Sequence, residues 1–182
     1  GMQSRRPRQD GRPYHLVLLA EDQKGYQNLL HLTTKGHLDG FYYKPRIDKE
    51  LLSQHCDGLV ALSACAKGEV AYLLGQGDAE GARRAAAWYR DIFGPDRFYL
   101  ELQEHDIPDL ADINRQLISI SHDLDIPLVA TNDVHYVRQE DIQAHDLLLC
   151  IQTNATVNDP NRMRMQGAGY HLRSFDEMAA LF

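Results

Sequence analysis

Short apolar runs alternate along this chain with longer amphipathic stretches, and this alternation limits the folds open to it more than any other feature. The runs have the length of buried strands, and the stretches between them repeat apolar residues at helical spacing. This order favours parallel pairing, because a helix carries the chain back to the starting edge of the sheet. The expected strands are residues 15–20, 58–63, 98–102, 126–131 and 170–173, and the expected helices begin near Tyr26, span residues 78–93, 109–124 and 139–151, and begin again after Ser174.

The sequence therefore predicts an α/β fold in which mostly parallel strands alternate with helices. An open doubly wound sheet and part of a barrel both fit five such strands. In either architecture, ligands gather where strands end and loops begin. Walker A, GxGxxG and GxSxG motifs are absent from the sequence, so phosphate-cradling loops and serine-hydrolase chemistry have no support.

Three strand boundaries carry side chains that can ligate a metal ion. Asp133 and His135 follow the strand at 126–131, and residues two apart in an extended segment point to the same side. Asp133 could equally cap the next turn, with His135 at the surface. Cys65 ends the strand at 58–63 as either a thiolate ligand or a small buried residue, and His15 opens the first strand as either a ligand or an edge residue. Taken together, imidazole, thiolate and carboxylate suit a borderline-soft ion.

Other polar residues favour plainer interpretations. Glu101 alternates with apolar residues and is expected on the polar side of its strand, while His145 and Asp146 are expected as a surface pair on a helix. The segment 36–48 is expected to be a loop around the cluster Phe41–Arg46. Its aromatic and basic side chains could stack on bases and grip phosphate, or could pack on their own domain.

Charge and cysteine content narrow the class of protein. Of the 182 residues, 43% are apolar and 25% are charged, as in an ordinary globular domain. Residues 1–13 hold four of the 19 basic and one of the 26 acidic residues, which leaves a net charge of −10 for residues 14–182 and a poor electrostatic fit to duplex nucleic acid. Three cysteines without a CxxC motif, no secretory signal and no apolar membrane-length run predict a reduced, cytoplasmic protein without a membrane span.

Several long strings resemble the C-family replicative polymerases of bacteria, the DNA polymerase III alpha subunits, in their amino-terminal PHP (polymerase and histidinol phosphatase) domain. The matching strings cover nearly the whole chain after residue 12 and include residues 14–20, 25–30, 40–48, 61–65, 98–102, 129–136, 144–152 and 159–164. Strings of this length in this order are far more specific than any single motif.

The resemblance implies a distorted (β/α)7 barrel that binds divalent metal ions, with zinc or manganese the expected ions. His15, Cys65, Asp133 and His135 fall on four of the family's nine ligand positions. The other five positions would precede residue 12, so the chain is expected to be a fragment without the first barrel strands and with an incomplete metal site. Residues 1–13 are then expected to be a tag remnant and flexible loop, and residues 14–182 the PHP domain fragment. The exposed barrel edge would favour self-association.

For the parent protein, the resemblance implies DNA-directed DNA synthesis, to which this domain contributes metal-dependent 3′–5′ exonuclease or phosphoesterase chemistry. The fragment alone is expected to be inactive. Its expected partners are DNA, bound through the parent polymerase, and other holoenzyme subunits, including the proofreading exonuclease subunit. A non-catalytic domain that docks this exonuclease subunit is the alternative. A free-standing phosphoesterase is a third interpretation, which the polymerase-like segment 40–48 weakens.

Overall fold

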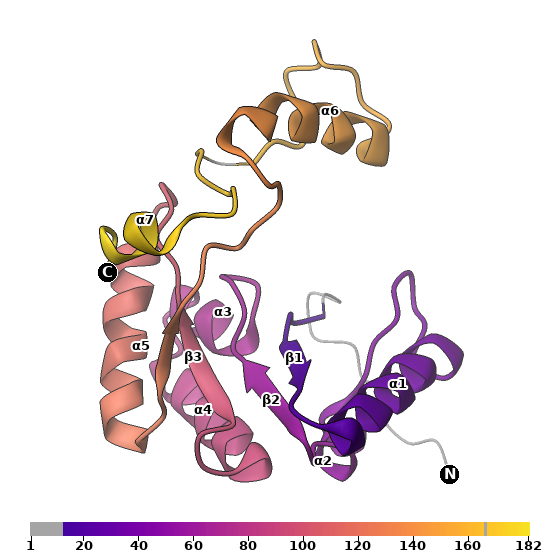
Figure 1. The fold of residues 1–182 in the computed structure, drawn as a ribbon, viewed down its shortest axis with the longest axis vertical. Helices are drawn as coiled ribbons and strands as arrows, with labels where there is room; N and C mark the ends of the chain where they lie inside the picture. Colours follow the sequence, from indigo (N-terminus) through magenta and orange to yellow (C-terminus); the bar gives the residue numbers. More distant parts are fainter. Residues whose placement is uncertain (1–12, 166) are drawn as a thin grey trace.

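A single four-stranded sheet organises the chain (Figure 1). The structure, a computed structural model, describes residues 13–165 and 167–182. The expectation of a tag remnant and flexible loop therefore falls, up to residue 12, outside the described residues. The strands follow one another across the sheet in chain order: β1 (Val17–Ala20), β2 (Leu59–Leu62), β3 (Phe98–Leu102) and β4 (Leu128–Ala130).

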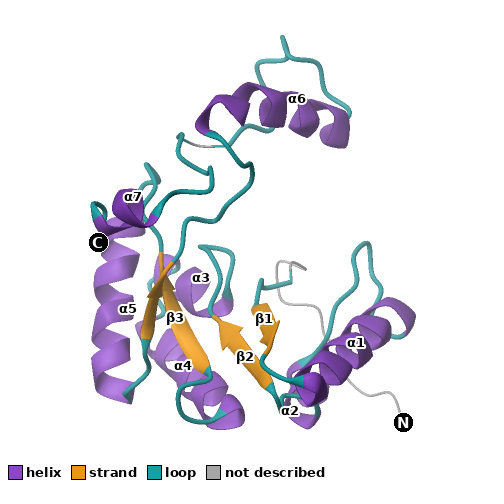
Figure 2. Ribbon diagram, in the orientation of Figure 1, coloured by secondary structure: helices purple, strands orange, loops and turns teal. Residues whose placement is uncertain are grey.

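Helices connect and flank these strands (Figure 2). Several begin at an aspartate whose carboxylate accepts a backbone N–H of the first turn, as Asp22 does from Gly25 and Asp78 from Gly81. The helices are α1 (Gln23–Leu38), α2 (Lys49–Gln54), α3 (Glu69–Gly75), α4 (Ala79–Phe93), α5 (Leu110–Leu124), α6 (Ile142–Thr153, preceded by the 3₁₀ turn Gln139–Asp141) and α7 (Phe175–Ala179).

The predicted α/β alternation is confirmed, with two kinds of difference. Helices α2 and α3 were not expected, because six and seven residues make too few turns to show a helical repeat. The expected strand at 170–173 is wrong: His171 forms only an isolated bridge with Tyr136, which lies in a segment that is itself irregular. The expected loop at 36–48 begins three residues later, at Asp39, after the end of α1 at Leu38.

The pairing of β1 corrects the expectation of parallel neighbours. β2, β3 and β4 are parallel, but β1 runs antiparallel to β2, with Val17 opposite Leu62 and Ala20 opposite Leu59. The reason lies at the start of β2. The Glu21 N–H donates to the carbonyl oxygen of Gly58 at 2.9 Å. The segment that contains α1 and α2 therefore returns the chain to the end of β1 rather than to its beginning.

The core lies between the sheet and helices α3, α4 and α5. Phe98 and Leu100 of β3 are almost completely buried, and α4 packs on β2 and β3 through a face of alanines. Small side chains let a helix approach a sheet closely, which keeps the interior dense. One stripe of α4 is buried throughout: Ala82, Ala86, Tyr89 and Phe93. On α5, Ile113, Leu117 and Ile120 are buried, whereas Ile118 is exposed.

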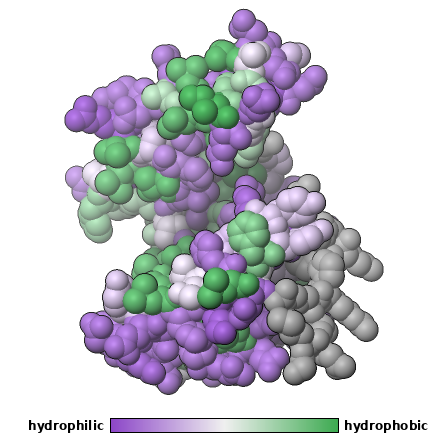
Figure 3. All heavy atoms as spheres, turned by 90° about the vertical axis from the view of Figure 1, so that its right-hand side faces the viewer, coloured by the Kyte–Doolittle hydropathy of each residue, from purple (hydrophilic) through white to green (hydrophobic). Residues whose placement is uncertain are grey.

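The segment that contains α6 stands apart from this core (Figure 1). Its helix exposes apolar side chains, above all Ile151, which is 77% exposed, together with Leu147 and Leu148. Figure 3 shows hydrophobic residues gathered on this part of the surface and a hollow between it and the body. Among the described residues, no helix combines the length and the apolar character that a bilayer crossing needs.

Candidate metal centre

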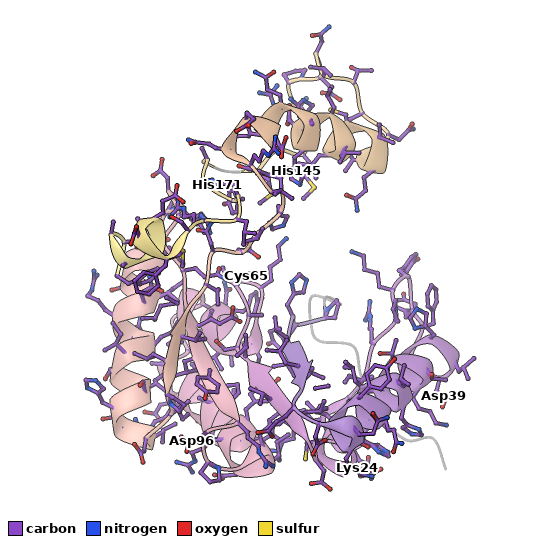
Figure 4. The ribbon with its side chains drawn as sticks, viewed as in Figure 1. Lys24, Asp39, Cys65, Asp96, His145 and His171 are labelled. Atoms are coloured by element: carbon purple, nitrogen blue, oxygen red, sulfur yellow. The ribbon has the colours of Figure 1, made fainter. Side chains whose placement is uncertain are left out.

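The strand ends of the sheet surround one cavity. Because β1 is antiparallel, its beginning lies at the edge where β2, β3 and β4 end. The cavity at this edge has a volume of about 560 Å³. It is lined by residues from all four strand ends: Tyr14, His15, Leu16, Val17, Ala64, Cys65, Glu101, Gln103, Thr131, Asn132, Asp133 and Val134. Figure 4 labels Cys65 at this edge, in the turn between β2 and α3.

Three of the four residues predicted as metal ligands meet in this cavity: His15, Cys65 and Asp133. The antiparallel β1 is what brings His15 there, since a parallel first strand would begin at the opposite edge. The side chains do not yet form a coordination sphere. In the part of the chain that the structure describes, no group of three His, Cys, Asp or Glu side chains lies close enough to hold an ion.

His135 does not line the cavity. The expected side-by-side projection of Asp133 and His135 required an extended segment, but Asp133 has a φ of 43° in the left-handed region, so the alternation ends there. The Nδ1 atom of His135 contacts the carbonyl oxygen of Asp133. If Nδ1 donates in this contact, Nε2 is the ring nitrogen left for a ligand, which is the usual arrangement of a metal-bound histidine.

Glu101 is buried, and does not lie on an exposed polar side of its strand as predicted. It is only 6% exposed. Its carboxylate accepts the backbone N–H of Ala64 and, at 2.7 Å, the hydroxyl of Thr131, while its own backbone N–H donates to Ser63 Oγ at 2.8 Å. It thereby joins the ends of β2, β3 and β4. The local sequence carries no signal for this burial, because the partners of the carboxylate come from distant segments.

The turn after β2 is held in an uncommon backbone conformation. Ala64 has a φ of 64°, which is unusual for a residue other than glycine. Strained residues of this kind persist only where the surroundings fix them, and they cluster at functional sites. Here the hydrogen bond from the Ala64 N–H to Glu101 fixes the turn. The next residue is Cys65, so the same contact orients a predicted ligand.

Burial dominates the protonation of the donor groups. It lowers the pKa of His15, with Lys67 and Lys44 acting in the same direction and Asp133 opposing them. It raises the pKa of the Cys65 thiol, and the nearby Asp133 carboxylate raises that pKa further. At neutral pH, His15 is therefore neutral and able to ligate, and Cys65 is a thiol that must lose its proton to bind an ion.

The donor chemistry fits a borderline divalent ion. An imidazole, a thiol and a carboxylate line a single cavity, and this combination suits zinc better than magnesium. Water or a phosphate oxygen could occupy the remaining space, because the cavity is far larger than one ion. The donor atoms of these residues thus suit a zinc-like ion. The side chains would have to move closer together at the strand ends to coordinate one ion jointly.

Comparison of the sequence with known proteins gives matches to DNA polymerase III alpha subunits over nearly the whole chain. It is 46% identical over 171 residues to the DNA polymerase III subunit alpha of Treponema pallidum, a match that covers 94% of this chain and 15% of that protein. The corresponding subunit of Borreliella burgdorferi is 44% identical over 169 residues, covering 93% of this chain and 15% of that protein. The corresponding subunit of Deinococcus radiodurans is 44% identical over 183 residues, covering 98% of this chain and 14% of that protein.

The chain thus spans about one seventh of the length of these relatives. The family model of the PHP domain matches residues 1–105, which is more than half of the chain. The matched range includes β1 to β3 and two of the cavity's donor residues, His15 and Cys65. The chain therefore belongs to the PHP domain family.

Proposed function

We propose that this chain is part of a bacterial replicative DNA polymerase, and that its cavity binds divalent metal ions for hydrolysis of phosphodiester bonds at the 3′ end of DNA. One observation carries the proposal: His15, Cys65 and Asp133 are far apart along the sequence but line one cavity. DNA synthesis, DNA binding and contacts with other holoenzyme subunits would belong to the complete polymerase. That polymerase would act in the cytoplasm, the compartment inferred from the cysteine content.

The residues of the chain have distinct tasks in this proposal. His15 and His135 would donate ring nitrogens, Cys65 its thiolate and Asp133 its carboxylate. Glu101 would keep the turn at Ala64 and the end of β4 in place, because it bonds to both. Bound divalent ions would polarise the phosphate oxygens and lower the pKa of a coordinated water. His15 is suited to its task at neutral pH, since its lowered pKa leaves the ring uncharged.

Substitutions in the complete polymerase test this function. We expect Asp133→Asn and His135→Ala to reduce hydrolysis of a 3′-labelled single strand to background while nucleotide incorporation stays largely intact, because the donors are lost and the fold is kept. The measurement is gel analysis of both activities on the same preparations, with metal content determined by elemental analysis. Equal loss of both activities would contradict the proposal and indicate a structural role.

A docking role is the second candidate, in which the domain carries the separate proofreading exonuclease subunit. Two observations favour it: no three donor groups among the described residues are at ligating distance, and α6 exposes Leu147, Leu148 and Ile151. Treatment of the polymerase with a chelator separates the candidates. Unchanged thermal stability and no hydrolysis before or after treatment would support docking, whereas a lower melting temperature and loss of hydrolysis would support the metal site.

A further inference from the structure

The loop between α1 and α2 presents aromatic side chains to solvent. We call residues 40–46 the aromatic-basic loop. Phe41 and Tyr42 are 57% and 59% exposed, and Tyr43 is 83% exposed. The alternative that these rings pack on their own domain is therefore wrong for the described part of the chain. Three consecutive exposed rings are a costly arrangement in water, and they call for a ligand with flat apolar faces.

The loop is held in shape by its own contacts. A Cβ atom at Gly40 would lie 1.9 Å from the carbonyl oxygen of Arg46, so the two ends of the loop touch and only glycine fits there. The Tyr42 N–H donates to the carbonyl oxygen of Lys44 at 3.1 Å. The rings of Tyr42 and Tyr43 meet edge to face with centroids 4.7 Å apart. Binding would thus cost little ordering of the loop.

Uncompensated positive charge accompanies the rings. The Arg46 guanidinium lies 5.1 Å from the centre of the Tyr42 ring. Nearby acids are engaged elsewhere: Asp39 pairs with Lys35, and Asp48 caps α2. Within residues 13–165 and 167–182, neither Lys44, Arg46 nor Lys67 forms an ion pair. This local positive charge contrasts with the acidic balance of the chain as a whole.

The aromatic-basic loop stands beside the cavity. The backbone N–H of His15 donates to the carbonyl oxygen of Lys67 at 3.1 Å, which places the Lys67 backbone next to a residue that lines the cavity. Lys44 is within electrostatic range of His15 as well. In Figure 1 the loop rises above α1, toward the end of the sheet at which β2 ends. Cations from two separate segments therefore lie near the same cavity residue, His15.

We propose that the aromatic-basic loop binds single-stranded DNA, with bases stacked on Tyr42 and Tyr43 and the phosphate backbone against Lys44 and Lys67. Exposed rings next to cations match a single strand, whose bases offer open faces, and not a duplex, whose bases are covered. The acidic surface elsewhere disfavours a duplex further. Delivery of the strand's end to the cavity rests on the function proposed above, whereas binding by the loop does not depend on it.

The test measures fluorescence anisotropy of a labelled oligothymidylate with the 182-residue chain, in the presence of a chelator. We expect the double substitution Tyr42→Ala and Tyr43→Ala to weaken binding about tenfold or more, because two stacking planes are lost. Tyr26→Ala is the matched control, since Tyr26 is 51% exposed on α1 and outside the loop, and it should change the affinity less than about twofold.

The salt dependence of binding separates stacking from charge. Lys44→Gln should lower the slope of log affinity against log salt concentration by about 0.7, whereas the tyrosine substitutions should leave it unchanged. Tyr43→Phe should retain binding, because the ring remains. Because the chelator removes divalent ions, binding under these conditions is measured separately from the metal-dependent hydrolysis.

A crosslinking experiment on the unmodified polymerase guards against misfolded variants. Irradiation with a single strand that carries 5-iododeoxyuridine near its 3′ end should label residues 41–44. Crosslinks only outside the loop, wild-type affinity of the double tyrosine variant, or duplex binding as tight as single-strand binding would each overturn the proposal.

Discussion

Ala64 directly precedes the proposed ligand Cys65, and Asp133 is itself a proposed ligand. Both residues adopt left-handed backbone conformations, which residues other than glycine usually avoid. Their neighbours supply the compensation. Glu101 accepts the Ala64 N–H, and Thr131, two residues before Asp133, donates its hydroxyl to the same carboxylate. Burial raises the pKa of Glu101, and these two donors oppose that rise. A single side chain thus stabilises two neighbouring turns of the cavity wall.

Replacement of Glu101 tests this role. Glu101→Gln leaves one side-chain oxygen for two donors, so we expect the free energy of unfolding to fall by about 1–3 kcal/mol. Urea titration followed by circular dichroism measures the loss. Glu104→Gln is the control, because Glu104 is exposed, and it should change stability by less than about 0.5 kcal/mol. Equal effects of the two substitutions would show that the buried hydrogen bonds contribute nothing.

At the scale of elements, the parts that sequence patterns could predict are those with regular periodicity. The strand at 98–102 has the predicted bounds, and the helices at 78–93 and 109–124 differ from α4 and α5 by one residue. Each buries most of an apolar face, and this burial accounts for the periodic pattern in the sequence. Neither the direction of β1 nor the burial of Glu101 could be predicted, because both depend on contacts between distant segments. The sequence predicted which donor residues would line the cavity, but not the distances between their side chains.

The junction between α1 and the start of β2 is such a contact. A Cβ atom at Gly25 would lie 1.7 Å from the carbonyl oxygen of Gly58, a backbone atom that cannot move independently. We expect Gly25→Ala to lower the free energy of unfolding by about 1–3 kcal/mol or more, through overpacking. Thermal denaturation provides the measurement. Gly75→Ala is the control, since its new methyl group would meet only Ile113 at an ordinary 3.7 Å, and a comparable loss there would refute the steric explanation.

At the scale of the whole molecule, β1 is an edge strand of the described sheet, and one of its edges pairs with no other described strand. Two of its apolar residues, Val17 and Leu19, are 37% and 50% exposed. Unpaired strand edges recruit further strands. The self-association of the chain stays a prediction, which this exposed edge strand supports.

Leu19→Lys should shift the 182-residue chain towards the monomer, because a charged side chain on an edge strand opposes pairing with a second copy. Analytical ultracentrifugation across a concentration series measures the shift. Ile118→Lys, on the exposed side of α5, is the matched substitution away from the edge and should leave the distribution unchanged. A chain that is monomeric at all concentrations would remove this role of β1.

The antiparallel first strand also means that His15 is held in place by fewer contacts than Cys65 and Asp133. Cys65 and Asp133 follow β2 and β4, which pair with β3 in parallel and which Glu101 ties together, whereas His15 precedes β1 and is attached through the antiparallel ladder to β2 and one bridge to Gly68. Fraying of β1 would withdraw the imidazole and leave the thiol and the carboxylate in place. Ion binding and fraying of β1 are therefore linked equilibria. Any contact that stabilises the pairing of β1 with β2 raises the affinity for the ion, and a bound ion in turn stabilises that pairing.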